Sequence, residues 1–490
     1  MEFSLDPLNP IVLLAELQLV LVIGISIRVI MNRPATGVAL AWLVIVVMIP
    51  YVGAAAYLMI GERRISPSRM ARLSQLRLDH HEFDDITVSQ GMTDVDWSRH
   101  TPAAHSMNIL GINTAGSRTF SGNDMELIAD TQQILQGITR DIDNAGISVL
   151  MEFYIWQEGG AANDVFDALI RAAGRGVYCM VLVDALGASA WWRGKQPGLL
   201  REAGVELKAA LPVGLFRSLV GRTDLRLHRK IVIIDGELAW TGSMNLVDPR
   251  YFKQGGGFGE WIDAMVRIQG TAVVALTAVI IGDWIVETGA NVREIVEKAG
   301  IRLPDPRGSA DIQVISSGPG VEGNALLKMM HALINNARHE VILTTPYLVP
   351  DDSLLWSLRG AVGRGVEVAI VVPKKVDSFL TRHAGHSYYD GLLAHGIKIH
   401  RYHGGLLHTK SIVADGEISM FGTVNLDMRS LWLNHEVSLF VYDRQFARKL
   451  GALQRSYIEN SDELDVESWS QRSVFTKFLE NTMRLMSPLL

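Results

Sequence analysis

Residues 228–235 read HRKIVIID, and residues 408–415 read HTKSIVAD. Both octets follow the pattern H-x-K-x4-D. In both, six further residues lead to a G-[ST]-x-N string, GSMN at 242–245 and GTVN at 422–425. One such octet arises readily by chance, but two with the same companion at the same offset indicate an internal repeat.

The repeat extends upstream of the octets. Residues 172–177, AAGRGV, precede the apolar run 179–183, and residues 361–366, AVGRGV, precede the run 368–372. A helix, a glycine-bearing turn and a β-rich run in each copy are typical of an α/β fold. We therefore predict two repeated α/β halves. They span residues 121–300 and 301–490 and follow a linker with some helix at 63–120.

The N-terminal region is far more apolar than the rest. Residues 11–31 are long enough to cross a hydrocarbon core of about 30 Å as a helix, and residues 35–60 form a second uncharged stretch that Pro50 is expected to kink. A cleaved signal peptide fits poorly, because Glu2 and Asp6 stand where positive charge is usual. A buried helical hairpin in a soluble core is the remaining alternative. We predict a transmembrane hairpin over residues 1–62.

Arginines suggest how this hairpin is oriented. Two spans leave both flanks on one side of the membrane, and basic residues concentrate in cytoplasmic flanks. The segment after the second stretch carries Arg63, Arg64, Arg69, Arg72 and Arg77. The sequence thus predicts a multi-pass membrane protein with its large C-terminal part in the cytoplasm.

Overall composition narrows the function classes. The chain of 490 residues has 46 Lys+Arg against 52 Asp+Glu, a net charge of −6. Nucleic-acid enzymes usually carry a strongly basic face, so we expect no nucleic-acid partner. The single cysteine, Cys179, excludes a disulfide within the chain. The sequence has no metal-ligand cluster such as paired cysteines or H-E-x-x-H, and we predict no metal site.

The octets carry the chemistry. The apolar, β-branched run after each histidine predicts a buried strand, on which residues two apart share a face. Neutral imidazole can attack phosphorus, and protonated imidazole can give a proton to a leaving oxygen. One of His228 and His408 is therefore the predicted nucleophile and the other the predicted acid, and the two start in opposite protonation states. Lys230 and Lys410 supply fixed positive charge without a metal.

Other polar residues around the repeat complete the candidate site. Glu260 and Glu436 are candidates to hold the non-reacting ring nitrogen of each histidine, as carboxylates do in catalytic triads. Four side chains are predicted to donate hydrogen bonds to phosphate oxygens: Ser243, Asn245, Thr423 and Asn425.

The aspartates that close the octets, Asp235 and Asp415, belong to the motif and are kept in the catalytic set on that ground. Each lies seven residues after its histidine. An odd separation on a regular strand points a side chain to the opposite face. We therefore expect both to be structural.

The halves differ before the first octet. Residues 209–222 are an insertion of about a dozen residues, apolar with interspersed arginines, such as Arg217 and Arg222. This composition is typical of a segment in a membrane interface, where arginines attract anionic headgroups, and a buried loop is the alternative. Residues 474–490 are similarly ambiguous, since they suit packing on the core and contact with a membrane equally.

The two octets match the HKD motifs of the phospholipase D superfamily. Residues 245–252 (NLVDPRYF), 404–410 (GGLLHTK) and 425–432 (NLDMRSLW), with the N-terminal spans, resemble bacterial cardiolipin synthases. The resemblance implies that the halves are α/β sandwiches related by a pseudo-twofold axis, with one active site shared at their interface. It also implies a location in the bacterial inner membrane.

The resemblance also implies a reaction. One phosphatidylglycerol gives its phosphatidyl group to a histidine, by analogy His228, and releases glycerol; a second phosphatidylglycerol then attacks, forming cardiolipin without cofactor or metal. Hydrolysis by a phospholipase D is the main alternative, because only the group that resolves the intermediate differs. A nuclease or a non-catalytic membrane scaffold is a further alternative.

Overall fold

The structure is a computed structural model that describes residues 10–34, 36–62, 67–212, 224–318 and 324–487. Its contacts divide the chain into two units. The smaller comprises residues 1–70 with 213–225, and the larger comprises residues 71–212 with 226–490. Each unit is described by itself.

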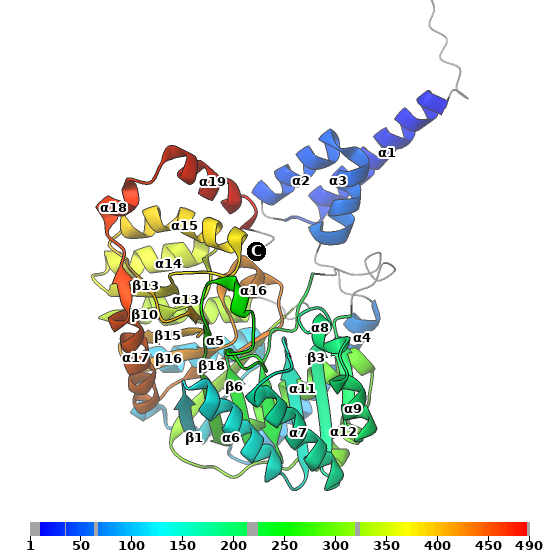
Figure 1. The fold of residues 1–490 in the computed structure, drawn as a ribbon, viewed down its shortest axis with the longest axis vertical. Helices are drawn as coiled ribbons and strands as arrows, with labels where there is room; N and C mark the ends of the chain where they lie inside the picture. Colours follow the sequence, from blue (N-terminus) through cyan, green and yellow to red (C-terminus); the bar gives the residue numbers. More distant parts are fainter. Residues whose placement is uncertain (1–9, 35, 63–66, 213–223, 319–323, 488–490) are drawn as a thin grey trace, which may run out of the picture. The chain divides into compact units, whose positions relative to one another are not determined.

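The larger unit is built on one 15-stranded sheet of order β19-β13-β12-β10-β15-β16-β18-β9-β1-β8-β6-β5-β2-β3-β4 (Figure 1). The first-half strands are β1 (Thr119–Ile128), β2 (Ser148–Phe153), β3 (Tyr178–Asp184), β4 (Glu206–Ala210), β5 (Ile231–Ile234), β6 (Leu238–Gly242) and β8 (Met265–Gly270). The second-half strands are β9 (Ala310–Ser317), β10 (Glu340–Thr344), β12 (Glu367–Pro373), β13 (Lys398–Tyr402), β15 (Ser411–Ala414), β16 (Ile418–Gly422), β18 (Glu436–Val441) and β19 (Ser461–Glu463).

Counted outward from the central β1–β9 pair, the strands of the two halves correspond one to one, except that β19 is an additional edge strand of the second half. That pair is antiparallel, as are β1–β8 and β18–β9. On both sides the octet strand, β5 or β15, lies between an antiparallel hairpin partner and an antiparallel outer strand. The predicted α/β fold with two related halves is therefore confirmed.

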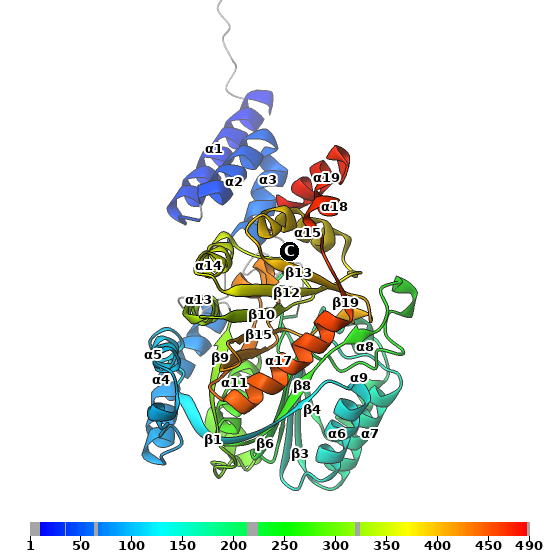
Figure 2. The same ribbon diagram turned by 90° about the vertical axis from the view of Figure 1, so that its left-hand side faces the viewer.

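Helices cover both faces of the sheet. In the first half, α6 (Thr131–Asp143), α7 (Ala161–Gly174) and α9 (Gln196–Glu202) share one apolar core with the strands, and α11 (Val273–Thr288) lies on the other face. In the second half, α13 (Ala325–Asn336), α14 (Asp352–Gly363) and α15 (Phe379–Leu393) share the core, and α17 (Arg444–Glu459) crosses the opposite face (Figure 2).

Short elements complete the unit. Two small ladders pair β11 (Leu348–Val349) with β17 (Leu426–Asp427), and β7 (Trp261–Ile262) with β14 (Leu406–Leu407). The remaining helices are α8 (Ser189–Trp192), α12 (Val292–Lys298), α16 (Met428–Trp432), α18 (Val466–Ser470) and α19 (Val474–Arg484). The segment expected as a linker holds α4 (Pro67–Ser89) and α5 (Pro102–Ala115).

The smaller unit is apolar and helical. Helix α1 (Pro10–Met31) is followed by α2 (Thr36–Met48), α3 (Pro50–Ala56) and a π-helical turn, Tyr57–Gly61. Val29, Val46 and Tyr57 form a small buried cluster among these helices. Within the described residues, only the segment Val12–Met31 is long and apolar enough to span a membrane. The second predicted span is instead interrupted at Pro50, which begins a new, shorter helix.

Candidate active site

The two histidines lie in extended segments that lead into β5 and β15. The backbone N–H of His228 donates to the carbonyl of His435 at 2.9 Å, and that of His408 donates to the carbonyl of Ile262 at 2.8 Å. Each histidine segment therefore runs beside a segment of the other half. Both side chains are buried, with 7% of His228 and 3% of His408 exposed.

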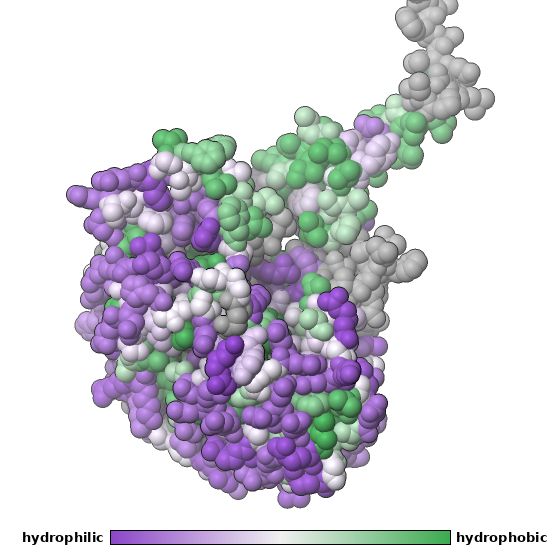
Figure 3. Space-filling view, in the orientation of Figure 1, coloured by the Kyte–Doolittle hydropathy of each residue, from purple (hydrophilic) through white to green (hydrophobic). Residues whose placement is uncertain are grey.

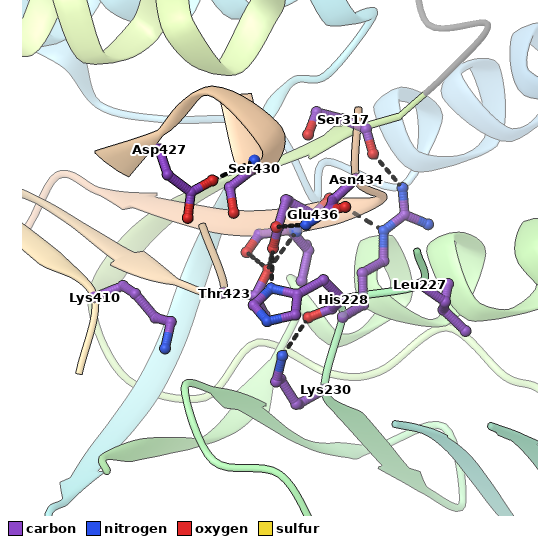
Figure 4. Close-up of polar contacts among 12 residues, drawn as sticks. Leu227, His228, Lys230, Ser317, Lys410, Thr423, Asp427, Ser430, Asn434 and Glu436 are labelled. Carbon is purple, nitrogen blue, oxygen red and sulfur yellow. Dashed lines mark hydrogen bonds and ion pairs between the residues drawn. The ribbon is translucent and has the colours of Figure 1, made fainter. Parts of the chain in front are cut away.

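A carboxylate from the opposite half holds each imidazole. His228 Nδ1 lies 2.9 Å from Glu436 Oε2, and His408 Nδ1 lies 2.7 Å from Asp263 Oδ1 (Figure 4 shows the His228 side). Glu436 is thus in contact with a histidine as predicted, but Glu260 is not; Asp263 takes that position. The site needs both halves, because neither contains a complete histidine–carboxylate pair.

The sheet register explains why Glu260 was the wrong choice. The glycines that open the two G-[ST]-x-N strings pair with equivalent strands: Gly242 faces Met265 in β8, and Gly422 faces Ser438 in β18. Two positions before these residues are Glu436 and Asp263, so they are structural equivalents. Glu260 is exposed and lies upstream of β7.

The hydroxyls predicted to bind phosphate serve the carboxylates instead. Ser243 Oγ donates to Asp263 Oδ1 at 2.6 Å, and Thr423 Oγ1 donates to Glu436 Oε2 at 2.6 Å. Each hydroxyl also accepts a backbone N–H at 3.0 Å, from Ala264 or from Val437. With its proton and one lone pair committed in this way, each hydroxyl fixes the carboxylate that orients a histidine.

The asparagines are closer to their predicted role. Asn245 is buried, and its Oδ1 accepts the N–H of Ile155 at 3.2 Å. Among the described residues its Nδ2 has no hydrogen-bond partner, so two buried N–H donors stay available. Asn425 is buried at the matching position, close to Asp427, which caps α16 through the N–H of Ser430.

The two lysines are fully buried and tethered alike. Lys230 Nζ donates to the carbonyl of His228 at 2.6 Å, and Lys410 Nζ donates to the carbonyl of His408. Burial lowers the pKa of Lys230 to about 7, and the pKa of Lys410 is also held well below its usual range by burial. The carboxylates Glu436 and Asp263 counter this by favouring the charged form of the lysines.

Burial also dominates the histidines. It lowers the pKa of both His228 and His408 to about 4, although the facing carboxylate partly opposes the shift. Burial alone would raise the pKa of Glu436 and Asp263, but the imidazole beside each holds it below the usual range. Burial thus favours the neutral form of both imidazoles in the site without substrate, while the facing carboxylates favour the charged form.

The octet aspartates are structural in the same way in both halves. Asp235 Oδ1 accepts the N–H groups of Ile147 and Ser148 at 2.7 and 2.8 Å, where β2 begins. Asp415 Oδ1 accepts those of His339 and Glu340 at 2.8 and 2.9 Å, where β10 begins. They hold the turn before the neighbouring strand and contact neither histidine.

A buried charged cluster lies behind His228, and sequence reasoning did not single it out. Arg229 forms an ion pair with Asp283 of α11 and donates to the carbonyls of Glu436 at 3.0 Å and Ser317 at 2.9 Å. Glu152 of β2 is fully buried close by, and burial together with the Asp283 carboxylate raises its pKa well above the usual value. Arg229 thereby joins the first half to two backbone carbonyls of the second.

The predicted headgroup-binding residues Arg217 and Arg222 lie outside the described residues. The insertion is described only at its start, where β4 ends at Ala210 and is followed by Leu211 and Pro212.

Two family models match parts of this chain. The family model described as "Cardiolipin synthase, PLD-like domain" matches residues 138–256 and 330–455, and a phospholipase D-nuclease N-terminal model matches residues 20–62. Proteins named cardiolipin synthase A are similar: the one from Erwinia tasmaniensis is 40% identical over 483 residues, and the one from Escherichia coli O1:K1 / APEC is 38% identical over 476. Both alignments cover 96% of this chain and 96% of the relative.

A crystal structure of phosphatidylserine synthase from Haemophilus influenzae has a similar fold. Its TM-score is 0.60 at 14% identity, and the match covers 79% of this chain and all of that one.

Proposed function

The chain belongs to the cardiolipin synthase family of the phospholipase D superfamily, and from this premise we propose how its two histidines divide the reaction between them. It is a phosphatidyltransferase that makes cardiolipin from membrane phospholipids. The observation that carries the mechanism is the pair of buried histidines whose Nδ1 atoms each face a carboxylate. This leaves Nε2 of each ring to react.

In the first step, Nε2 of His228 attacks the phosphorus of phosphatidylglycerol. The bond from phosphorus to the glycerol headgroup oxygen breaks, and His408 gives that oxygen its proton. Glycerol leaves, and the phosphatidyl group stays on His228 as a phosphoramidate. The charges of Lys230 and Lys410, with the free N–H groups of Asn245, support the non-bridging phosphate oxygens.

In the second step, a headgroup hydroxyl of another phosphatidylglycerol attacks the same phosphorus. His408, now neutral, takes the hydroxyl proton, the phosphorus–nitrogen bond breaks, and cardiolipin forms. His228 returns to its neutral state, and His408 returns to its protonated state, ready for the next cycle.

His408 takes up its proton from solvent when the substrate binds. In the site without substrate, burial disfavours charge on both imidazoles. A phosphodiester anion beside the rings favours a protonated imidazole, and it also favours charged lysines. Substrate binding therefore sets the opposite protonation states that the mechanism needs.

The function is tested with purified protein in vesicles of phosphatidylglycerol alone, by mass spectrometry of the lipids. We expect cardiolipin and free glycerol in equal amounts. Phosphatidic acid without cardiolipin would identify a hydrolase instead. Mixed vesicles with phosphatidylethanolamine test whether a second kind of lipid serves as acceptor, and protein with both histidines changed to alanine gives the background.

The membrane arrangement belongs to the same proposal: a multi-pass anchor in a bacterial inner membrane, with the catalytic unit in the cytoplasm. Helix α1 and the arginines after residue 62 support it. Cysteine substitutions at exposed positions of the catalytic unit should react with a membrane-impermeant thiol reagent only in inverted membrane vesicles. Labelling in intact cells whose outer membrane has been made permeable would place the unit on the other side.

A further inference from the structure

Helix α19 has an inner face that is fixed by charge. Glu480 is only 2% exposed, and it pairs with Arg472 at 3.1 Å and with His386 of α15 at 3.4 Å. Arg472 also pairs with Asp390 of α15 at 2.9 Å and lies 3.9 Å from the ring centre of Trp469. The only acidic side chain of α19 is thereby buried against α15, and the helix is held in one orientation.

The outer face of α19 is apolar and exposed. Val474 is 85% exposed, Phe475 76%, Phe478 68% and Leu485 77%. We call these four residues the α19 patch; it is visible as an apolar area over α19 at the upper left of Figure 3. The start of α15 adds exposed Phe379 and Leu380 to the same helical layer. Apolar groups gathered on a protein surface in this way mark interaction sites.

The charge on α19 is one-sided. Lys477 and Arg484 are its basic residues, and Glu480, its one acidic residue, is taken up by the inner face. A helix with aromatic residues on one side, flanking basic residues and no exposed acid matches the chemistry of an anionic membrane interface.

Helices α15 and α19 lie near the edge of the sheet at which the two histidine segments are found. Helix α15 follows the end of β12, and a Cβ on its Gly385 would lie 3.0 Å from the carbonyl of Leu348 in β11. Strand β11 pairs with β17, directly after Asn425. At the same edge Thr344 of β10 faces Ser411, which follows the His408 segment. Contacts thus connect α19 through α15, β11 and β17 to the active site.

We propose that the α19 patch docks onto an anionic lipid bilayer, so that phosphatidylglycerol headgroups reach the histidines from the surface on which α19 lies. The inference rests on the proposed function for the identity of the lipid. Phe475 and Phe478 enter the interface, and Lys477 and Arg484 meet the headgroups. Under this proposal both alternatives for residues 474–490 hold for α19, because its inner face packs on α15 and its outer face contacts lipid.

A fluorescent probe tests the contact without relying on catalysis. Full-length Phe478→Cys is labelled with an environment-sensitive probe, Cys179 being buried, and reconstituted in phosphatidylglycerol vesicles containing a nitroxide lipid. The matched control is Gln445→Cys, exposed on α17 at the opposite face of the sheet. We expect a blue shift and strong quenching at position 478, little at 445, and weaker quenching at 478 in neutral phosphatidylcholine.

Two results would overturn the docking surface. Equal quenching at the two positions would show that α19 has no preferred contact with lipid. A blue shift at 478 without quenching by lipid would show that protein covers the patch: a second copy if labels on different chains transfer energy, or the chain's own N-terminal helices if they do not.

Activity provides a second readout. Phe475→Asp with Phe478→Asp should lose at least about tenfold in cardiolipin formation on vesicles, because the two aromatic side chains proposed to enter the bilayer are replaced by charge. Activity on short-chain, monomeric phosphatidylglycerol should be unchanged. Phe475→Leu with Phe478→Leu, which stays apolar, should keep vesicle activity. Equal losses on both substrates in the aspartate variant would contradict the proposal.

Lipid quenching without any cardiolipin would instead count against the proposed function and leave the docking surface intact.

Discussion

The groups around the imidazoles of His228 and His408, called the front here, are alike. The groups around the next residues in the chain, Arg229 and Thr409, called the back, differ. In front, each imidazole has a lysine two residues on, a carboxylate from the other half, and a hydroxyl that holds that carboxylate. These matched groups are the ones that the proposed chemistry uses. The likeness explains why the sequence alone does not choose between the histidines.

Behind the histidines the halves diverge. Arg229 occupies the place of Thr409, which contacts Tyr457 at 3.2 Å. Glu152 faces Ile231 in the first half where Thr344 faces Ser411 in the second. Asp283 and Gln454 are each the eleventh residue of their helices, α11 and α17. A charged cluster in one half therefore replaces a neutral one in the other. The difference teaches that the groups proposed to act on substrate are alike in the two halves, while the residues packed on the other side of the histidine segments make the two environments unequal.

Removing either histidine should have the largest effect, and the two variants should lose activity to the same extent. His228→Ala and His408→Ala are each expected to lower cardiolipin formation by roughly 10⁴-fold or more, as for other coupled nucleophile–base pairs. The rate is measured on phosphatidylglycerol vesicles. His395→Ala, an exposed histidine of α15's end, serves as the control and should stay near the unmodified rate. More than a hundredth of normal activity in either site variant would refute the two-histidine mechanism.

Neutralising the crossing carboxylates should show that both histidines depend on the opposite half. Asp263→Asn and Glu436→Gln are each expected to lower kcat by about 10²-fold or more, because the imidazole loses the group that fixes its orientation. Glu260→Gln is the matched control and should change kcat less than twofold. A larger loss from Glu260→Gln than from Asp263→Asn would contradict the register.

Breaking the ion pair behind His228 should expose the difference between the halves. Arg229→Gln leaves the largely buried Asp283 carboxylate without its guanidinium partner, so the free energy of unfolding should fall by about 3 kcal/mol. Adding Asp283→Asn should restore part of the loss. Thr409→Val, at the equivalent position, should cost only about 1 kcal/mol. Denaturant unfolding of detergent-solubilised protein measures these losses. Equal losses from Arg229→Gln and Thr409→Val would show that the two positions contribute equally to stability, against the prediction.

The octet aspartates should behave alike. Asp235→Asn and Asp415→Asn each weaken the charge-assisted hydrogen bonds that hold a partly exposed turn, and a loss of about 1–3 kcal/mol in stability is expected for both. Activity per folded molecule, measured at low temperature, should stay within about twofold of normal for both. A loss of kcat without a loss of stability would show that these aspartates take part in catalysis.

The smallest expected effect is on pH dependence. A histidine whose pKa falls from 6.5 unfolded to about 4 folded binds fewer protons in the folded state, so stability should drop as pH falls from 6.5 toward 4. The thermal midpoint should decrease by several degrees over this range. His228→Gln with His408→Gln should reduce that slope. An unchanged slope would show that these imidazoles are not the groups that titrate.

Sequence patterns predicted the halves and the histidine–lysine pairs because these lie at fixed local spacings. The partner of each histidine was not predictable in this way. From the asparagine of G-[ST]-x-N, the acid lies 18 residues on at Asp263 but 11 on at Glu436. The seven extra residues precede β7, and only the pairing of β6 with β8 shows which acid is equivalent. The exchange of carboxylates between halves likewise depends on how the two halves join in one sheet, which no local pattern encodes.

The interruption of the second N-terminal stretch was foreseen at Pro50, but its consequence was not. Pro50 begins α3, and the close approach that Gly53 permits to the carbonyl of Ile45 accompanies the break. The role of Ser243 and Thr423 was also missed, since a hydroxyl near phosphate chemistry is by residue type as suited to phosphate as to a carboxylate.

The most direct test of the central claim is to trap the covalent intermediate and locate its bond. Protein mixed briefly with short-chain phosphatidylglycerol is quenched in base, in which phosphohistidine survives, then digested and analysed by mass spectrometry with a chemical standard for each ring isomer. Because Glu436 occupies Nδ1 of His228, the account predicts phosphatidyl on Nε2 of His228. An adduct on Nδ1, on His408, or on no histidine would contradict it.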